Sequence, residues 1–337
     1  MYDEYAEYNH GAGPESQRPT IPISVALLVT EPTQRLNHCI HAISLQDLDR
    51  REFELIIVDA SGKTYLRPII TPYTNKLNIN VIKCYGASPT EARNTAVSEA
   101  SGDTIVFTSP ETMARPTWLS SIKRWTDSHP TALIAGSVVI SKKHNPYACA
   151  DAYIQSHVRR VAPLDHAVTT WTLTNAAFPT AVLREIGGFR SKASNQPRSE
   201  ERTIADQWRK LGHPIVFADD AVVQGDDQAD FKDFTKRYAL AGKQNAFWRK
   251  RIASMAAQQK PVARIDRRLL QAPFENEKHL GRALKISTLL AWAQAAQLYG
   301  ETTGKRRRLT PSSFDLGARA KTTAHSAKPA KFTISKK

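Results

Sequence analysis

Residues 53–59 read FELIIVD, a short and mostly apolar run that is rich in β-branched residues and ends on Asp59. A run of this length and composition predicts a strand that is buried on both faces of a sheet. Similar runs lie before and after it along the chain, as PISVALLV (22–29), INVIKCY (79–85) and DTIVFT (103–108).

Helical patterns separate these runs. Leu36, Ile40 and Ile43 have helical spacing after the first run. Before the fourth run, Ser88-Pro-Thr-Glu91 has the form of a capping box with proline in the first turn, which predicts the start of a helix that carries Arg93. Strands that alternate with helices in this way favour an α/β fold with a mostly parallel sheet flanked by helices.

Polar residues follow the predicted strands where a parallel α/β sheet binds its ligands, at the carboxyl ends. They are candidate site residues on that ground: Thr30, Glu31, Asp59, Ser109 and Glu111. The sequence contains neither GxGxxG nor GxxxxGK[ST], so dehydrogenase and NTPase functions lose their usual support.

The composition bounds the class of protein. A chain of 337 residues with 41% hydrophobic residues can build a core, so wholesale disorder is excluded. Its three cysteines form no CxxC pair, which argues against a disulfide framework and a cysteine zinc site and favours a reducing cytosol. No apolar run reaches the length of a membrane span, and the N-terminus lacks the pattern of a signal peptide. We therefore expect a cytoplasmic protein.

The formal net charge of +15 is concentrated at the C-terminus. Residues 301–337 contain ten Lys and Arg residues against two acids and few apolar residues, which predicts a basic disordered tail. Such a tail is either a solubilising end or an electrostatic contact with anionic lipid or nucleic acid. Nucleic-acid binding is the weaker alternative, because no nucleic-acid-binding motif is present.

Six segments together resemble family 2 glycosyltransferases with the GT-A fold. They read ISVALLVT, FELIIVDASG, SPTEARNTAVSEASG, DTIVFTSPE, LTNAAFPTAVLREIGGF and SEERTIADQWRKLGHPIVFADDAVV. The resemblance covers about residues 21–225 and implies a GT-A domain over 21–228, with a nucleotide-sugar half (21–115) and an acceptor half (116–228). A flexible segment (1–20) would precede the domain, and a helical extension (229–300) would separate it from the tail.

The resemblance also implies roles for individual residues. Asp59 would accept hydrogen bonds from the nucleotide base, and Arg93 would donate to the base or the diphosphate. Glu200 and Glu201 occupy the position of the family's acidic pair, in which the second acid is the usual general base; two acids in the first turn of a helix would equally complement the helix dipole. On the acceptor side the resemblance places Thr174 and Asn175.

The sequence departs from the family at the metal site. Family members have an aspartate-rich triplet where this chain has Ser109-Pro110-Glu111, and a histidine near the position of Gln224 to Asp227. Only Glu111 of the triplet offers a carboxylate to Mg²⁺ or Mn²⁺. Three interpretations remain: a site rebuilt from Glu111 with Asp226 or Asp227, a metal-independent transferase, or a catalytically silent relative.

The extension contains two helical patterns. Residues 230–255 place Phe231, Phe234 and Tyr238 at helical spacing with cations between them, which indicates packing against the sheet or, alternatively, an interfacial helix on anionic lipid. Residues 282–299 predict a second apolar helix, too short to span a membrane. These features suit a peripheral protein on the inner face of a membrane.

From the resemblance we expect an inverting enzyme that transfers a sugar from a UDP- or GDP-type nucleotide-sugar to a hydroxyl of a glycan or lipid-linked glycan. The alternative is a GT-A-fold binding or scaffold protein without turnover.

Overall fold

The structure is a computed structural model, and it describes residues 21–30, 35–62, 66–140, 145–161, 171–190, 199–225, 230–251 and 267–306. The predicted N-terminal segment (1–20) and all but the first residues of the predicted tail lie outside these ranges.

The four predicted strands are present and pair side by side. β1 (Ile21–Val29) lies between β2 (Phe53–Asp59) and β4 (Gly102–Thr108), and β3 (Ile79–Lys83) pairs with β2; all three pairings are parallel. β3 is two residues shorter than the sequence predicted, because the chain turns at Cys84. The expectation of an α/β fold is confirmed.

The second half of the sheet is mixed. The order is β3-β2-β1-β4-β7-β6-β8-β5, with β7 (Asn175–Pro179) antiparallel to both neighbours and β6 (Leu133–Ile140) parallel to β8 (Ile215–Gly225). The short β5 (Thr112–Ala114) pairs antiparallel with the end of β8. The parallel character that the sequence predicted therefore holds fully for the first four strands, while antiparallel pairings enter the second half.

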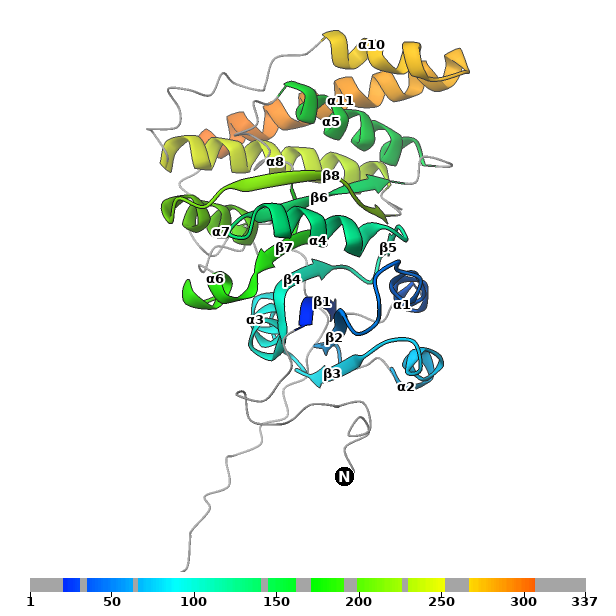
Figure 1. Cartoon of the computed structure of the whole chain (residues 1–337). Helices are drawn as coiled ribbons and strands as arrows, with labels where there is room; N and C mark the ends of the chain where they lie inside the picture. Colours follow the sequence, from blue (N-terminus) through cyan, green and yellow to red (C-terminus); the bar gives the residue numbers. More distant parts are fainter. Residues whose placement is uncertain are drawn as a thin grey trace, which may run out of the picture.

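Helices cover both faces of the sheet (Figure 1). One face packs on α1 (Leu36–Ser44), α2 (Arg67–Ile70), the short 3-10 helix η3 (Thr71–Tyr73) and α4 (Trp118–Ser128). The other packs on α3 (Pro89–Glu99), α6 (Thr180–Glu185) and α7 (Ser199–Lys210). Because the strands are apolar on both sides, each face has a hydrophobic core of its own.

The capping box at the start of α3 is confirmed. The Ser88 amide donates to Glu91 Oε2 at 2.8 Å, and the Glu91 amide donates to Ser88 Oγ at 3.3 Å. These hydrogen bonds from the Ser88 amide and hydroxyl lower the pKa of Glu91. They fix the start of α3 beside the carboxyl ends of β1 and β2.

Four further helices form a helical layer at the β8 end of the sheet, at the top of Figure 1. They are α5 (Pro146–Val161), α8 (Phe231–Arg251), α10 (Arg267–Asn276) and α11 (Leu280–Arg306). Phe234 and Tyr238 of α8 are buried in a core made by these helices, so packing against the sheet was the wrong prediction for them. α11 continues to Arg306, past the predicted boundary at residue 300.

Among the described helices, none combines the length and the apolar character needed to cross a membrane.

Candidate active site

Asp59 ends β2 at the edge of the sheet where the parallel strands have their carboxyl ends. Its side chain is only 1% exposed. Oδ1 accepts hydrogen bonds from the Ser61 amide at 3.0 Å and the Ser61 hydroxyl at 2.7 Å. Oδ2 is buried and has no hydrogen-bond partner among the described residues. A buried carboxylate oxygen without a donor is costly, so it marks a place where a bound ligand can donate.

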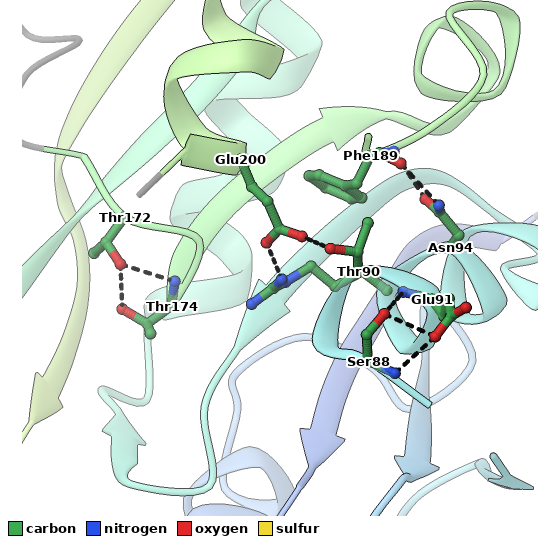
Figure 2. Close-up of polar contacts among 9 residues, drawn as sticks. Ser88, Thr90, Glu91, Asn94, Thr172, Thr174, Phe189 and Glu200 are labelled. Atoms are coloured by element: carbon green, nitrogen blue, oxygen red, sulfur yellow. Dashed lines mark hydrogen bonds and ion pairs between the residues drawn. The ribbon is translucent and has the colours of Figure 1, made fainter. Parts of the chain in front are cut away.

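Glu200 lies in the first turn of α7 and contacts α3. Its carboxylate forms an ion pair with the Arg93 guanidinium and accepts a hydrogen bond from the Thr90 hydroxyl; Figure 2 shows the contact with Thr90. The guanidinium predicted to serve the donor therefore binds an acid of the predicted catalytic pair. The contact links the part of the chain predicted as the nucleotide-sugar half to the part predicted as the acceptor half.

Glu201 follows Glu200 on α7, and its surroundings differ. Its side chain is half-buried and makes no hydrogen bond or ion pair with another described residue. Successive residues of a helix point about 100° apart, so Glu201 is directed away from the contact that holds Glu200. Of the two acids, Glu201 is the one whose carboxylate has no partner among the described residues.

The segment that replaces the aspartate triplet follows β4. The Ser109 carbonyl accepts from the Thr112 amide at 3.0 Å, and the Ser109 hydroxyl accepts from the Glu111 amide at 3.3 Å. Glu111 is exposed and pairs with Arg35 at 3.5 Å. Burial, with a smaller effect from the Glu111 carboxylate, raises the pKa of the neighbouring Cys39 thiol to about 12.

The metal-ligating side chains of the described residues do not form a site that could hold a divalent cation by carboxylates alone. Across the described ranges, no group of three or more His, Cys, Asp or Glu side chains could hold a metal ion. Glu111 is the only carboxylate of its triplet and is already paired with Arg35. Asp226 and Asp227, the other carboxylates considered from the sequence, lie outside the described residues.

The predicted acceptor residues differ in exposure. Asn175 is fully buried: its Nδ2 donates to the Ser137 and Ala221 carbonyls at 2.9 Å each, and its Oδ1 accepts from Trp118 Nε1 at 2.9 Å. An acceptor could reach this amide only after these bonds break, so the structure assigns Asn175 to packing rather than to acceptor binding. Thr174 is partly exposed and its hydroxyl lies 3.1 Å from that of Thr172 (Figure 2).

Two further predicted residues follow β1. Thr30 is exposed directly after the strand, at the same edge of the sheet as Asp59. Glu31 lies outside the described residues.

Sequence reasoning missed two residues that shape this edge. Thr90 holds Glu200, and Asn94 clamps the backbone of Phe189, donating from Nδ2 to the carbonyl at 2.9 Å and accepting from the amide at 2.8 Å (Figure 2). Gly188 has a φ of 67°, and a Cβ there would meet the Asn94 amide oxygen at 2.5 Å. The asparagine beside Arg93 and the GGF turn were visible in the sequence, but nothing in it paired them.

The mixed eight-stranded sheet flanked by helices is a GT-A-type fold. Residues 29–187 match the family model described as Glycosyl transferase family 2, which confirms the resemblance predicted from the sequence.

The comparisons with individual proteins agree with this class. The chain is 25% identical over 96 residues to poly(ribitol-phosphate) β-N-acetylglucosaminyltransferase TarS of Staphylococcus aureus, in each of the strains Mu50 and MW2. The match covers 28% of this chain and 17% of the length of those relatives.

Two solved structures share the fold. S. aureus TarS 1-349 in complex with UDP-GlcNAc has a TM-score of 0.51 at 16% identity, covering 85% of this chain and 91% of that one. The mannosyltransferase PcManGT from Pyrobaculum calidifontis, in complex with GDP-Man and Mn²⁺, has a TM-score of 0.50 at 15% identity, covering 87% and 78%.

Proposed function

We propose that this chain transfers a sugar from a nucleotide-sugar donor to a hydroxyl of a glycan or lipid-linked glycan, with inversion at the anomeric carbon. The observation that carries the proposal is Asp59 Oδ2, a buried acceptor without a partner among the described residues at the strand edge of a domain that matches the family 2 model. A nucleobase N–H is a donor of the kind that this oxygen lacks.

The two acids of α7 have different roles in this proposal. Glu201, whose carboxylate is unoccupied among the described residues, accepts the proton of the attacking hydroxyl, whose oxygen then bonds to the anomeric carbon. The bond between that carbon and the diphosphate oxygen breaks, and the nucleoside diphosphate leaves with the electron pair. Glu200 positions the start of α7 through Thr90 and Arg93.

The donor is of UDP or GDP type. The fold neighbours support both bases, since TarS was solved with UDP-GlcNAc and PcManGT with GDP-Man. Glu111 is the only carboxylate of its triplet, and no group of three or more His, Cys, Asp or Glu side chains in the described ranges could hold a metal ion, which supports compensation of the charge on the leaving diphosphate by protein cations and backbone donors.

Asp59→Asn separates a functional carboxylate from a structural one. The change removes the charge but keeps the size, so we expect unfolding stability to be retained or increased, while nucleotide affinity falls by about 1.5 to 3 kcal/mol, on the order of 10- to 150-fold. Calorimetric titration with UDP, GDP, UDP-GlcNAc and GDP-Man measures the affinity, with Ser61→Ala as the matched control. Unchanged binding by Asp59→Asn would place the base elsewhere.

Metal removal tests the altered triplet. We expect donor affinity to change less than about tenfold between EDTA and Mn²⁺, because a single exposed carboxylate binds a divalent cation weakly. Activity that EDTA abolishes and Mn²⁺ restores would contradict this and favour a site rebuilt with residues such as Asp226.

The altered triplet also favours a second candidate, a GT-A-fold binding protein without turnover. The two functions differ in one measurement: release of nucleoside diphosphate from the donor in the presence of acceptor glycans. Donor binding without any release would support the second.

A further inference from the structure

The outer face of α11 exposes apolar side chains over most of the helix. Leu280, Leu284, Trp292 and Tyr299 are separated by four, eight and seven residues, so they lie on one side of the helix, and their exposed fractions run from 45% for Trp292 to 75% for Leu280. The opposite side, including Ile286 and Leu290, is buried in the core of the helical layer. Exposed apolar side chains gathered on one face of a helix mark an interaction surface.

The same surface extends onto α8. Phe231 is exposed, and its ring lies 5.4 Å from that of Trp292, centroid to centroid. Trp292 Nε1 donates to the Thr235 hydroxyl at 2.9 Å, which fixes the indole between the two helices. We call this surface the aromatic patch; it comprises Phe231, Leu280, Leu284, Trp292 and Tyr299.

The charges on the α11 side of the aromatic patch are cationic, whereas the start of α8 carries two exposed acids, Asp230 and Asp233, beside its lysines. Along α11 the only acid is Glu301, whose side chain is buried, whereas Lys285 is exposed next to Leu284. On α8, Lys232 and Lys236 are exposed one turn apart, adjacent in sequence to the two residues that touch Trp292. By sequence, the 31 residues that follow α11 add eight Lys and Arg against one Asp.

We propose that the aromatic patch docks on an anionic phospholipid membrane, with α11 lying in the plane of the interface. Leucines enter the acyl boundary, the indole and phenol rings sit at headgroup level, and the lysines meet lipid phosphates. A second copy of the chain is a poorer occupant along α11, because Lys285 of the two copies would meet and the exposed face of α11 offers no carboxylate to pair with it; the exposed carboxylates of the surface, Asp230 and Asp233, lie at the start of α8. The proposal does not depend on the donor chemistry of the catalytic site.

Vesicle flotation of the full chain tests the docking. The vesicles are phosphatidylcholine alone, or phosphatidylcholine with about 30% phosphatidylglycerol. The test variant is Leu284→Ser with Tyr299→Ser, both at exposed positions, and the matched control is Leu45→Ser with Leu211→Ser, which are also exposed but lie outside the patch. Thermal melts establish that each variant folds as the parent does.

We expect the parent to float with the anionic vesicles and not with the neutral ones, and its bound fraction to fall as salt rises from about 0.05 to 0.5 M. The patch variant should lose about tenfold or more in partition coefficient, and the control less than about twofold. Equal binding by patch variant and parent, or no binding by the parent, would overturn the proposal.

Two other results would also overturn it. The first is that deletion of residues 307–337 abolishes vesicle binding while the patch variant still binds as the parent does. This result would assign the membrane contact to the terminal segment. A dimer in gel filtration that the patch variant dissociates, without vesicle binding by the parent, would make a second copy the occupant.

Discussion

Glu200 and Glu201 are neighbours in sequence but have different surroundings. Glu200 is held by Thr90 and Arg93 of α3, whereas the Glu201 carboxylate has no partner among the described residues. A general base needs a carboxylate oxygen free to accept a proton, and both Glu200 oxygens are already engaged, one by the Arg93 guanidinium and one by the Thr90 hydroxyl.

We therefore predict that Glu201→Gln lowers the rate of sugar transfer by about 10² to 10⁴-fold while donor affinity stays within about twofold. The amide keeps the size of the side chain but cannot take the proton. Steady-state turnover and calorimetric donor binding measure the two effects. Full turnover by Glu201→Gln would move the base to another residue.

For individual residues, the sequence predicted the place in the fold better than the hydrogen-bond partners. Asp59 lies at the end of β2, as the pattern FELIIVD predicted, because the strand ends where the continuous apolar run meets a polar residue. Asn175 was expected at the acceptor, and it is instead buried against Ser137, Ala221 and Trp118. These partners are distant in sequence, so no local pattern could have revealed its hydrogen bonds.

Among the elements, α3 and α7 are joined across the two predicted halves of the domain by the Arg93–Glu200 pair. The side chains are 20% and 16% exposed, so the pair is less screened than a surface pair. The residues just before α7 lie outside the described ranges, and this pair is the ionic contact that fixes the start of α7 among the residues described.

A double-mutant cycle with Arg93→Ala and Glu200→Gln measures the link. We expect each single change to lower the free energy of unfolding by about 1 to 3 kcal/mol, with a coupling energy of at least about 1 kcal/mol. The control cycle is the exposed pair Lys123–Asp127 on α4, for which about 0.3 to 0.5 kcal/mol is expected. Equal coupling in the two cycles, measured by denaturant unfolding, would show that the α3–α7 pair contributes no more than a surface pair.

The elements that sequence predicted well are those with local signals. The strands of the first half are apolar on both faces, and the capping box marks the start of α3 within four residues. The direction of β7 and the partners of α8 depend on pairings between distant segments, which hydrophobic periodicity does not encode. For this reason Phe234 was correctly predicted as a core residue but assigned to the wrong core.

In the molecule as a whole, the helical layer has its own core beside the two cores of the sheet. α5 connects the layer to β6, whereas Asp59 lies on β2, at the other end of the strand order. We expect the layer to respond to changes in its packing without transmitting them to the edge of the sheet that carries Asp59, which we call the nucleotide edge after its proposed function, because the two regions share no core residues.

Two glycines make this separation testable, because they let α8 and α11 approach closely. A Cβ on Gly300 would overlap the Ala239 carbonyl, and a Cβ on Gly242 would overlap the Gln297 carbonyl; both obstacles are backbone atoms, which cannot move unless the helices separate. Gly300→Ala should therefore destabilise the layer by about 1 to 3 kcal/mol. The matched control is Gly281→Ala on the same helix, where a Cβ meets nothing within 4 Å, and it should be neutral or slightly stabilising.

Hydrogen exchange of Gly300→Ala should rise in α8 and α11 and stay unchanged in β1, β2 and β4, with nucleotide affinity within about twofold of the parent. Faster exchange in β1 and β2, or a large loss of nucleotide affinity, would mean that the layer and the nucleotide edge unfold as one cooperative unit.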